Sequence, residues 1–409
     1  MDYTIDNFDW EFYINEYKDL RDAGILTKEK AWWHWCNYGC KENRINRKIN
    51  NDTIKYKEPH TIKNIIISST QYPGYGGAAT NAYELIKFFR KKGFNVCGIF
   101  FGRDLPDKCD PDNISGIFSY SYGEEYAIDS DPIIKQIQNY FNGEPDICLA
   151  KNYIAPLFCK RFFKCYTVYL VSGINHFRLF FPEKTGLEIL DNNFIINSEW
   201  ENKNEKETNK ICDKIVCNSN ITKSIFKKIY PEFKEKIGKV IDTTCVSKNI
   251  VMESKNKEYD IAIVCSNLTR KCKNNEFLIP ILKNPIFNKY KKIIVGNNYE
   301  NFQFIPNSIC TGLLSHTEAI KIMSKSKILL FPSFFDSNSN TVREAYNHKC
   351  IPIITKNIGY AELFPTYLVC NGFSIDEWTN KIFRTITYYS YIKHIKIDYQ
   401  KTISINDFL

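Results

Sequence analysis

Two carboxylates separated by seven residues stand where an apolar, strand-like run gives way to a helix. Asp336 lies in the polar loop, and Glu344 lies one turn into the helix that follows. Both side chains can reach one ligand, and carboxylates accept hydrogen bonds from sugar or ribose hydroxyls. The helix start offers unpaired N–H groups and a positive dipole end, which suit a diphosphate. We expect Ser339, Asn340 and Thr341 to line this anion site.

A glycine-rich stretch joins the first strand-like run of the chain to a helix. Gly74, Gly76 and Gly77 would let the backbone approach a phosphate or a sugar closely. A glycine-rich loop alone is weak evidence for such a site. Farther along, His176 follows another buried run. It could face the same ligand, although a lone histidine is more often a structural hydrogen-bonding group.

From residue 64 onward, apolar runs alternate with amphipathic segments, which is typical of a parallel sheet with crossover helices. The expected strands cover residues 64–69, 94–101, 146–151, 165–172 and 214–218, and then 259–265, 291–295, 308–311, 327–332 and 350–355. These two sets predict an α/β chain with two Rossmann-like, doubly wound lobes that face each other across a cleft. Ligands in such sheets bind at the carboxyl ends of the strands.

Two helix starts in the second lobe have the spacing of capping boxes. They are Ser315 with Glu318 and Ser374 with Glu377. His316 directly follows the first of these caps, and we expect it to have a structural role.

The first 50 residues differ from the rest because aromatic side chains are dense there. Thr27 can cap a helix that Gly39 ends, which suggests two short helices packed around an aromatic core. Polar stretches mark the boundaries between the parts of the chain. The expected parts are a small helical module (1–50), a first lobe (60–250), a second lobe (256–385) and a carboxy-terminal tail (386–409).

The charge of the chain argues against one class of partner. Its net charge of +9 comes from cations spread along all 409 residues. A nucleic-acid-binding protein would concentrate them in runs or on one helix face, so we expect no nucleic-acid partner. Mild basicity fits an anionic small molecule or a peripheral contact with an acidic membrane surface.

The location of the protein is predicted from its apolar segments and its cysteines. No window approaches the roughly 18 apolar residues that a membrane span needs, and the acidic and aromatic first residues do not indicate a signal peptide. The 15 cysteines include no CxxC pair, so we expect no metal. Several stand inside apolar runs, where reduced cysteine acts as a small apolar residue. We therefore expect a reduced, cytoplasmic setting.

The stretch 331–355 resembles the carboxy-terminal lobe of retaining glycosyltransferases of family 4, which have the GT-B fold. In that family an acidic residue, seven others and Glu-Ala precede a strand that contains a proline, and here the match continues to Glu362. The resemblance covers about residues 60–385. It implies that Glu344 holds the donor ribose and that Asp336, in place of the usual glutamate, lies near the donor sugar. The alternative is that both are ordinary loop and surface-helix residues.

The resemblance extends to the basic residues that follow the strand 259–265. Arg270 and Lys273, with Lys271 as an alternative, would neutralise a leaving diphosphate, which is the largest electrostatic need of glycosyl transfer without a metal. Any one of these residues could instead belong to a solvated basic turn.

The function that the resemblance implies is transfer of a sugar from a nucleoside diphosphate donor to an acceptor, with retention of configuration and no cofactor. The leaving phosphate then helps to take the acceptor proton, whereas an inverting relative would need a base such as His176. The loop at Gly76 and Gly77 resembles the family's first-lobe loop, and the amino-terminal stretch resembles a small helical module found beside bacterial and viral glycosyltransferases. Two alternatives remain: a nucleotide-sugar-binding scaffold without turnover, favoured by Asp336 and the irregular basic motif, and a sugar-nucleotide epimerase.

Overall fold

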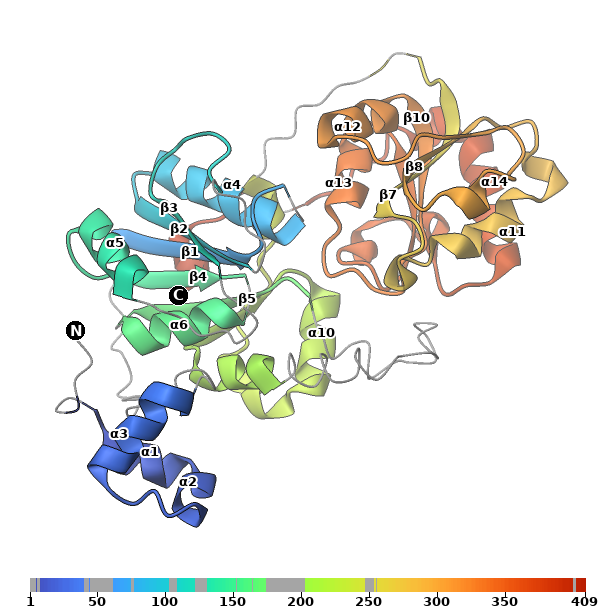
Figure 1. Cartoon of the computed structure of the whole chain (residues 1–409). Coiled ribbons are helices and arrows are strands. Elements are labelled where there is room, and N and C mark those ends of the chain that lie inside the picture. Colours follow the sequence, from blue (N-terminus) through green and yellow to red (C-terminus); the bar gives the residue numbers. More distant parts are fainter. Residues whose placement is uncertain are drawn as a thin grey trace. The chain divides into compact units, whose positions relative to one another are not determined.

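The computed structural model of the chain (Figure 1) describes residues 5, 8–39, 44, 62–74, 77–102, 109–121, 131–151, 153–163, 165–173, 203–246, 254, 256–399 and 402–409. Two predicted site residues, Gly76 and His176, lie outside the described residues. The chain divides into two compact units. The first comprises Met1–Leu170, Asn204–Val216 and Ser404–Leu409, and the second comprises Val171–Lys203 and Cys217–Ile403.

The amino-terminal helices surround a small aromatic core. They are α1 (Trp10–Glu16), α2 (Lys18–Asp22), α3 (Lys28–His34) and the π-helical turn η2 (Trp35–Gly39). The predicted cap is present, because the Thr27 hydroxyl accepts a hydrogen bond from Lys30 N at 3.4 Å. Three helices replace the predicted two because Tyr17 adopts an extended backbone that separates α1 from α2. The buried core consists of Phe8, Tyr13, Ile14, Leu20, Ala31 and Trp35.

The first unit contains a six-stranded sheet in the order β3-β2-β1-β4-β5-β6. Its strands are β1 (Asn64–Thr70), β2 (Asn95–Gly102), β3 (Ile117–Ser121), β4 (Ile147–Ala150), β5 (Tyr166–Val171) and β6 (Lys214–Cys217). Pairing is parallel from β3 through β5. Five of these strands match the predicted runs. The edge strand β3 was not predicted, since its half-exposed residues do not form an apolar run.

Helices cover both faces of this sheet. Figure 1 shows α4 (Gly77–Lys91) on one face, and α5 (Asp131–Phe141) and α6 (Ile154–Phe162) on the other. Apolar residues of α5 and α6 share one buried cluster with alternate residues of β1, β2 and β4. This alternation follows from the strand period of two residues. The crossover helices therefore hold the carboxyl ends of the strands at one edge.

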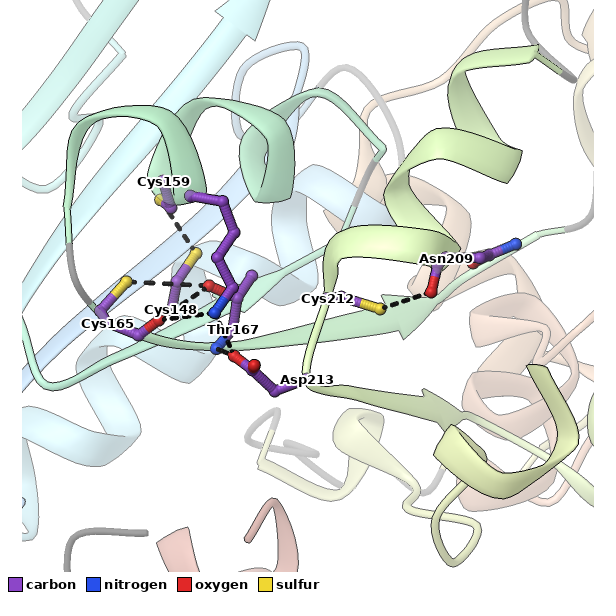
Figure 2. A network of polar contacts seen from close by, with 8 residues as sticks. Cys148, Cys159, Cys165, Thr167, Asn209, Cys212 and Asp213 are labelled. Carbon is purple, nitrogen blue, oxygen red and sulfur yellow. Dashed lines mark hydrogen bonds and ion pairs between the residues drawn. The ribbon is translucent and has the colours of Figure 1, made fainter. Parts of the chain in front are cut away.

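Polar contacts join α6 to the strand β4 and, through Asp213, the residue before β6, to the strand β5. Figure 2 shows the Asp213 carboxylate beside Thr167, whose backbone N–H donates to Asp213 Oδ2 at 2.7 Å. Lys160 Nζ lies 2.5 Å from the same oxygen. Figure 2 also shows the sulfur atoms of Cys148 and Cys159, which are 3.3 Å apart. None of the described cysteines forms a disulfide, and the cytoplasmic setting stays a prediction.

The second unit contains a six-stranded sheet in the order β12-β11-β10-β7-β8-β9. Its strands are β7 (Tyr259–Asn267), β8 (Lys292–Asn297), β9 (Ser308–Cys310), β10 (Ser326–Phe331), β11 (Ile351–Thr355) and β12 (Val369–Cys370). All neighbouring strands pair in parallel. Both sheets thus have the doubly wound order 3-2-1-4-5-6. The two-residue strand β12 was not predicted because it is too short to show a pattern.

The helices of the second unit are α10 (Asn220–Ile229), α11 (Leu278–Leu282), α12 (His316–Ser324), α13 (Asn340–Asn347), α14 (Ile375–Thr387) and α15 (Tyr389–Ile392). Figure 1 shows α12 and α13 on one side of this sheet and α11 and α14 on the other. The capping box of Ser315 and Glu318 is confirmed. Ser374 also caps its helix, but the Glu377 carboxylate instead accepts from Asn371 N at 3.1 Å. The second predicted box is therefore only half formed.

Residues 203–211 are also helical. The short 3-10 turns are η4 (Pro231–Lys236), η5 (Thr243–Val246), η6 (Lys271–Lys273), η7 (Asn275–Phe277), η8 (Pro285–Phe287), η9 (Glu300–Phe302), η10 (Ala361–Leu363), η11 (Thr366–Leu368) and η12 (Ile405–Asp407). Where the structure describes the chain, none of its helices has both the length and the apolar character needed to cross a bilayer.

Candidate functional site

The predicted acidic and basic residues of the second unit meet at the carboxyl ends of its two central strands, β7 and β10. The strand order reverses between these strands, and doubly wound sheets bind ligands at such a point. The loop after β7 contains η6, and the loop after β10 contains Asp336. The two loops are joined by a hydrogen bond of 3.1 Å from Phe334 N to Cys272 O.

An ion pair connects the two predicted donor-site groups on these loops. Lys273 Nζ lies 2.5 Å from Asp336 Oδ2 and 4.9 Å from the centre of the Phe331 ring. Burial acts to lower the pKa of Lys273, but the charge of Asp336 and the hydrogen bond to it more than offset burial and leave the pKa raised. Lys273 is therefore an ammonium at neutral pH.

The backbone around Asp336 is held against the loop that follows β11. Asp336 N donates to Asn357 O at 3.3 Å, and Gly359 N donates to Asp336 O at 2.7 Å. A Cβ atom on Gly359 would lie 1.9 Å from the carbonyl oxygen of Ser337. Only glycine permits this approach without displacing the chain, so Gly359 helps to fix the position of the Asp336 carboxylate.

The other two predicted cations differ in their surroundings. The Arg270 side chain is exposed and has no hydrogen bond or ion pair with the described residues. Lys271 Nζ lies 3.4 Å from the carboxylate of Glu276. Arg270 is thus the cation at this loop that can turn toward a ligand without breaking a contact.

The helix α13 begins where the sequence predicts. Ser339 is its N-cap, and its hydroxyl accepts from Val342 N at 3.4 Å. Asn340 and Thr341 are the first helical residues and are partly exposed. N–H groups in the first turn of a helix have no acceptor within that helix. The site can therefore offer backbone donors at Asn340 and Thr341, whereas the Ser339 oxygen is already engaged in the cap.

The Glu344 carboxylate has a partner that sequence reasoning missed. Glu344 Oε1 lies 2.8 Å from Nε2 of His316, and the side chains are 21% and 75% exposed. The hydrogen bond to Glu344 raises the pKa of His316. The order of the elements could have indicated this contact. His316 begins the helix that follows β9, and α13, which carries Glu344, begins after β10. Both helices therefore begin at the carboxyl edge of the same parallel sheet.

A buried ion pair supports both the loop and the helix. Arg343, next to Glu344 in α13, is paired with Asp242, and both side chains are buried. Asn338, in the loop that carries Asp336, donates to Asp242 Oδ1 at 2.8 Å. Asp242 is thus bonded both to the loop that carries one candidate carboxylate and to the helix that carries the other. No local pattern in the sequence indicates this contact.

The glycine loop belongs to the first unit. Gly77 is the first residue of α4, and Gly74 has a left-handed φ of 95°. Gly74 N donates to Thr80 Oγ1 at 3.1 Å, which ties the loop to α4. The loop follows β1, one of the two strands where the order of the first sheet reverses. The described residues hold no cluster of three or more His, Cys, Asp or Glu side chains that could bind a metal ion.

Comparisons with known proteins find similarity in structure alone. No family model matches the chain, and no curated protein sequence does. The sucrose-phosphate synthase of Thermosynechococcus elongatus has a TM-score of 0.60 and 12% identity over 81% of this chain and 91% of that chain. Starch synthase IV from Arabidopsis thaliana, in its catalytic domain bound to ADP and acarbose, has a TM-score of 0.55 and 12% identity over 81% and 92%. HepE from Anabaena, in complex with UDP, has a TM-score of 0.51 and 13% identity over 80% and 90%.

These similarities extend over most of this chain and nearly all of each solved chain. Identities of 12–13% show likeness of fold and leave the activity to be argued from the site. The fold expected from the stretch 331–355 is confirmed. The chain has the GT-B fold of the glycosyltransferases that it resembles in structure, with two Rossmann-like parallel sheets and amino-terminal helices.

Proposed function

We propose that this chain is a glycosyltransferase that moves a sugar from a nucleoside diphosphate donor to an acceptor, with retention of configuration. One observation carries the proposal. Asp336 and Glu344, with seven residues between them, stand at the switch point of the second sheet, and each is bonded to a basic side chain. A site with two carboxylates for hydroxyl groups and several cations for phosphate suits a sugar nucleotide.

The proposed roles follow from the position of each group. Glu344 accepts hydrogen bonds from the donor ribose, and Asp336 lies beside the donor sugar. Lys273, Arg270 and the first N–H groups of α13 neutralise the diphosphate. Lys273 is already an ammonium in contact with Asp336, so it can move to the phosphate by rotation of its flexible side chain. These cations and the helix dipole supply the charge that the leaving group needs, so the proposed reaction uses no metal.

The nucleoside diphosphates in two of the similar structures support this ligand class. Starch synthase IV was solved with ADP, and HepE with UDP. In the proposed reaction the bond from the anomeric carbon to the phosphate oxygen breaks, and a bond to the acceptor oxygen forms on the same face. The acceptor proton goes to the leaving phosphate. From the resemblance in sequence, Gly76, Gly77 and His176 are further proposed to contribute to donor binding.

Binding and turnover test the proposal. Thermal shifts are measured with UDP-, ADP-, GDP- and dTDP-sugars in the presence of EDTA, for wild type, Glu344→Ala and the exposed control Glu300→Ala. Ligand binding to the native state raises the unfolding midpoint by mass action. We expect one donor to stabilise wild type and the control but not Glu344→Ala, and to be hydrolysed slowly or transferred.

Other outcomes would contradict parts of the proposal. Stabilisation without hydrolysis or transfer to any acceptor would favour the binding scaffold. Conversion of the donor to another sugar nucleotide would identify an epimerase. If no sugar nucleotide changes the midpoint, the second lobe does not bind the proposed donor.

A further inference from the structure

We propose that His316 positions the Glu344 carboxylate for the hydroxyl groups of the donor ribose. This inference rests on the proposed function and assigns a residue to it. Its basis is the contact of 2.8 Å between His316 Nε2 and Glu344 Oε1, which joins the first turn of α12 to α13.

Both sides of this contact are anchored in the backbone. His316 follows the N-cap Ser315, and the capping box of Ser315 with Glu318 fixes the start of α12. At the other side, His348 Nδ1 lies 2.7 Å from the carbonyl oxygen of Glu344. The imidazole of His316 and the carboxylate of Glu344 therefore project from two fixed helix turns.

The geometry leaves one carboxylate oxygen for a ligand. An ionised carboxylate only accepts hydrogen bonds, so Nε2 of His316 carries the proton in this contact. Oε1 of Glu344 is occupied by His316, and no residue that the structure describes bonds to Oε2. Holding Oε1 fixes the direction of Oε2, which then accepts from a ribose hydroxyl. Pre-organising a group in this way reduces the entropy lost when the ligand binds.

The charges around His316 show that Glu344 is its main electrostatic partner. On its own helix, the carboxylate of Glu318 accepts from both Ser315 N and Ser315 Oγ. On α13, the neighbouring Arg343 is buried in its pair with Asp242. The raised pKa of His316 has the hydrogen bond and the charge of Glu344 as its causes, with burial acting against them. Neutral and protonated His316 both donate from Nε2, so the contact persists through neutral pH.

The experiment compares nucleotides with and without ribose hydroxyls. Calorimetry measures the affinity of wild type, His316→Ala, His316→Gln and the exposed control Thr317→Ala for UDP and ADP and for their 2′,3′-dideoxy analogues. We expect His316→Ala to weaken binding of the ribonucleotide by about fivefold, the value of one hydrogen bond. Binding of the dideoxy analogue should not change. His316→Gln, which keeps a donor, should restore most of the affinity, and the control should match wild type.

Three results would overturn the inference. A loss that is equal for the two kinds of nucleotide would show a general structural effect, and no loss would show that His316 is dispensable. In both cases the proposed function would stand. If wild type binds no nucleoside diphosphate, the proposed function fails and this inference fails with it.

The contact itself can be tested without a ligand. Titration of the His316 ring by NMR, assigned from the signal lost in His316→Gln, should give a pKa above the ordinary histidine value in wild type. That pKa should fall in Glu344→Gln, because the carboxylate charge is removed. An unchanged pKa would overturn the inference at its first step.

Discussion

Lys273 donates to Asp336 between two loops that leave adjacent central strands of the second sheet, with 2.5 Å between Nζ and Oδ2. The contact between His316 and Glu344 has the same form, because a basic side chain again holds one oxygen of a candidate carboxylate. In each pair the base comes from the earlier segment and the acid from the loop or helix after β10. Each candidate carboxylate is therefore paired with a basic side chain, and a donor phosphate must compete with Asp336 for Lys273.

The first prediction concerns this competition. Lys273→Met removes a cation from the proposed diphosphate site and also removes the ion-pair partner of Asp336. A bound phosphate would then be repelled by a carboxylate whose charge is not neutralised. We expect affinity for a nucleoside diphosphate to fall by about tenfold or more. The control is Lys283→Met, at an exposed position of the same unit outside the proposed site. Calorimetry that gave equal affinities for the two variants would contradict the proposed role of Lys273.

The second prediction concerns Gly359, whose backbone packs closely against the backbone of Ser337. In Gly359→Ala the new Cβ would lie 1.9 Å from Ser337 O, so the loop that carries Asp336 must move. We expect a lower unfolding midpoint and a large loss of nucleotide affinity. Gly372→Ala is the matched control, because nothing lies within 4 Å of its added Cβ. A Gly359→Ala protein with wild-type affinity would show that the position of this loop is not critical.

The elements that the sequence predicts are those with a local signal. Thr27, Ser315 and the start of α13 follow from capping residues, and most strands follow from apolar runs. The strands β3 and β12 lack such runs, since one is half exposed and the other has two residues. The partner of Glu344 was missed for another reason. His316 stands 28 residues away, and only the packing of α12 beside α13 brings the two together.

The third prediction concerns the buried pair of Arg343 and Asp242. Replacing one member leaves the other charge buried without its partner, which costs about 3–5 kcal/mol. We expect Arg343→Met to lower the free energy of unfolding in urea by this amount. The contact between Lys325 and Glu258, of 2.8 Å and largely exposed, provides the control, and Lys325→Met should leave the urea midpoint nearly unchanged. Equal midpoints for the two variants would show that the Arg343 pair does not stabilise the fold.

The fourth prediction is a dependence of stability on pH. Hydrogen bonding to Glu344 raises the pKa of His316 in the folded state. The stabilisation from this pair is therefore complete below the pKa of the unfolded chain and is lost as pH rises through the folded pKa. We expect wild type to exceed His316→Gln in urea midpoint more at pH 5.5 than at pH 8.5. The difference should be small, because 75% of the His316 side chain is exposed. A difference that is constant over this range would contradict the pairing.

The last prediction concerns a lysine at the start of β8 that is fully buried. Lys292 Nζ donates to the carbonyl oxygens of Phe287 at 2.7 Å, Tyr290 at 2.9 Å and Pro306 at 2.7 Å. The ammonium thus donates to three carbonyls in the turns before β8 and β9, and the carbonyl of Phe287 also accepts from Tyr290 N at 3.1 Å. Burial lowers the pKa of Lys292 to about 8, so burial of the ammonium partly offsets the gain from these bonds.

Lys292→Met tests which of these two effects is larger. Methionine fills the space but leaves the carbonyls of Tyr290 and Pro306 without their donor, whereas Phe287 O keeps its bond from Tyr290 N at 3.1 Å. Each unsatisfied group costs about 1–3 kcal/mol. The variant also avoids the cost of burying an ammonium, which offsets part of this loss. We therefore expect the free energy of unfolding in urea to fall by about 2–4 kcal/mol. Lys283→Met, at an exposed position in the same unit, should have no effect. A Lys292→Met protein as stable as wild type would mean that the cost of burying the ammonium equals the value of its three hydrogen bonds.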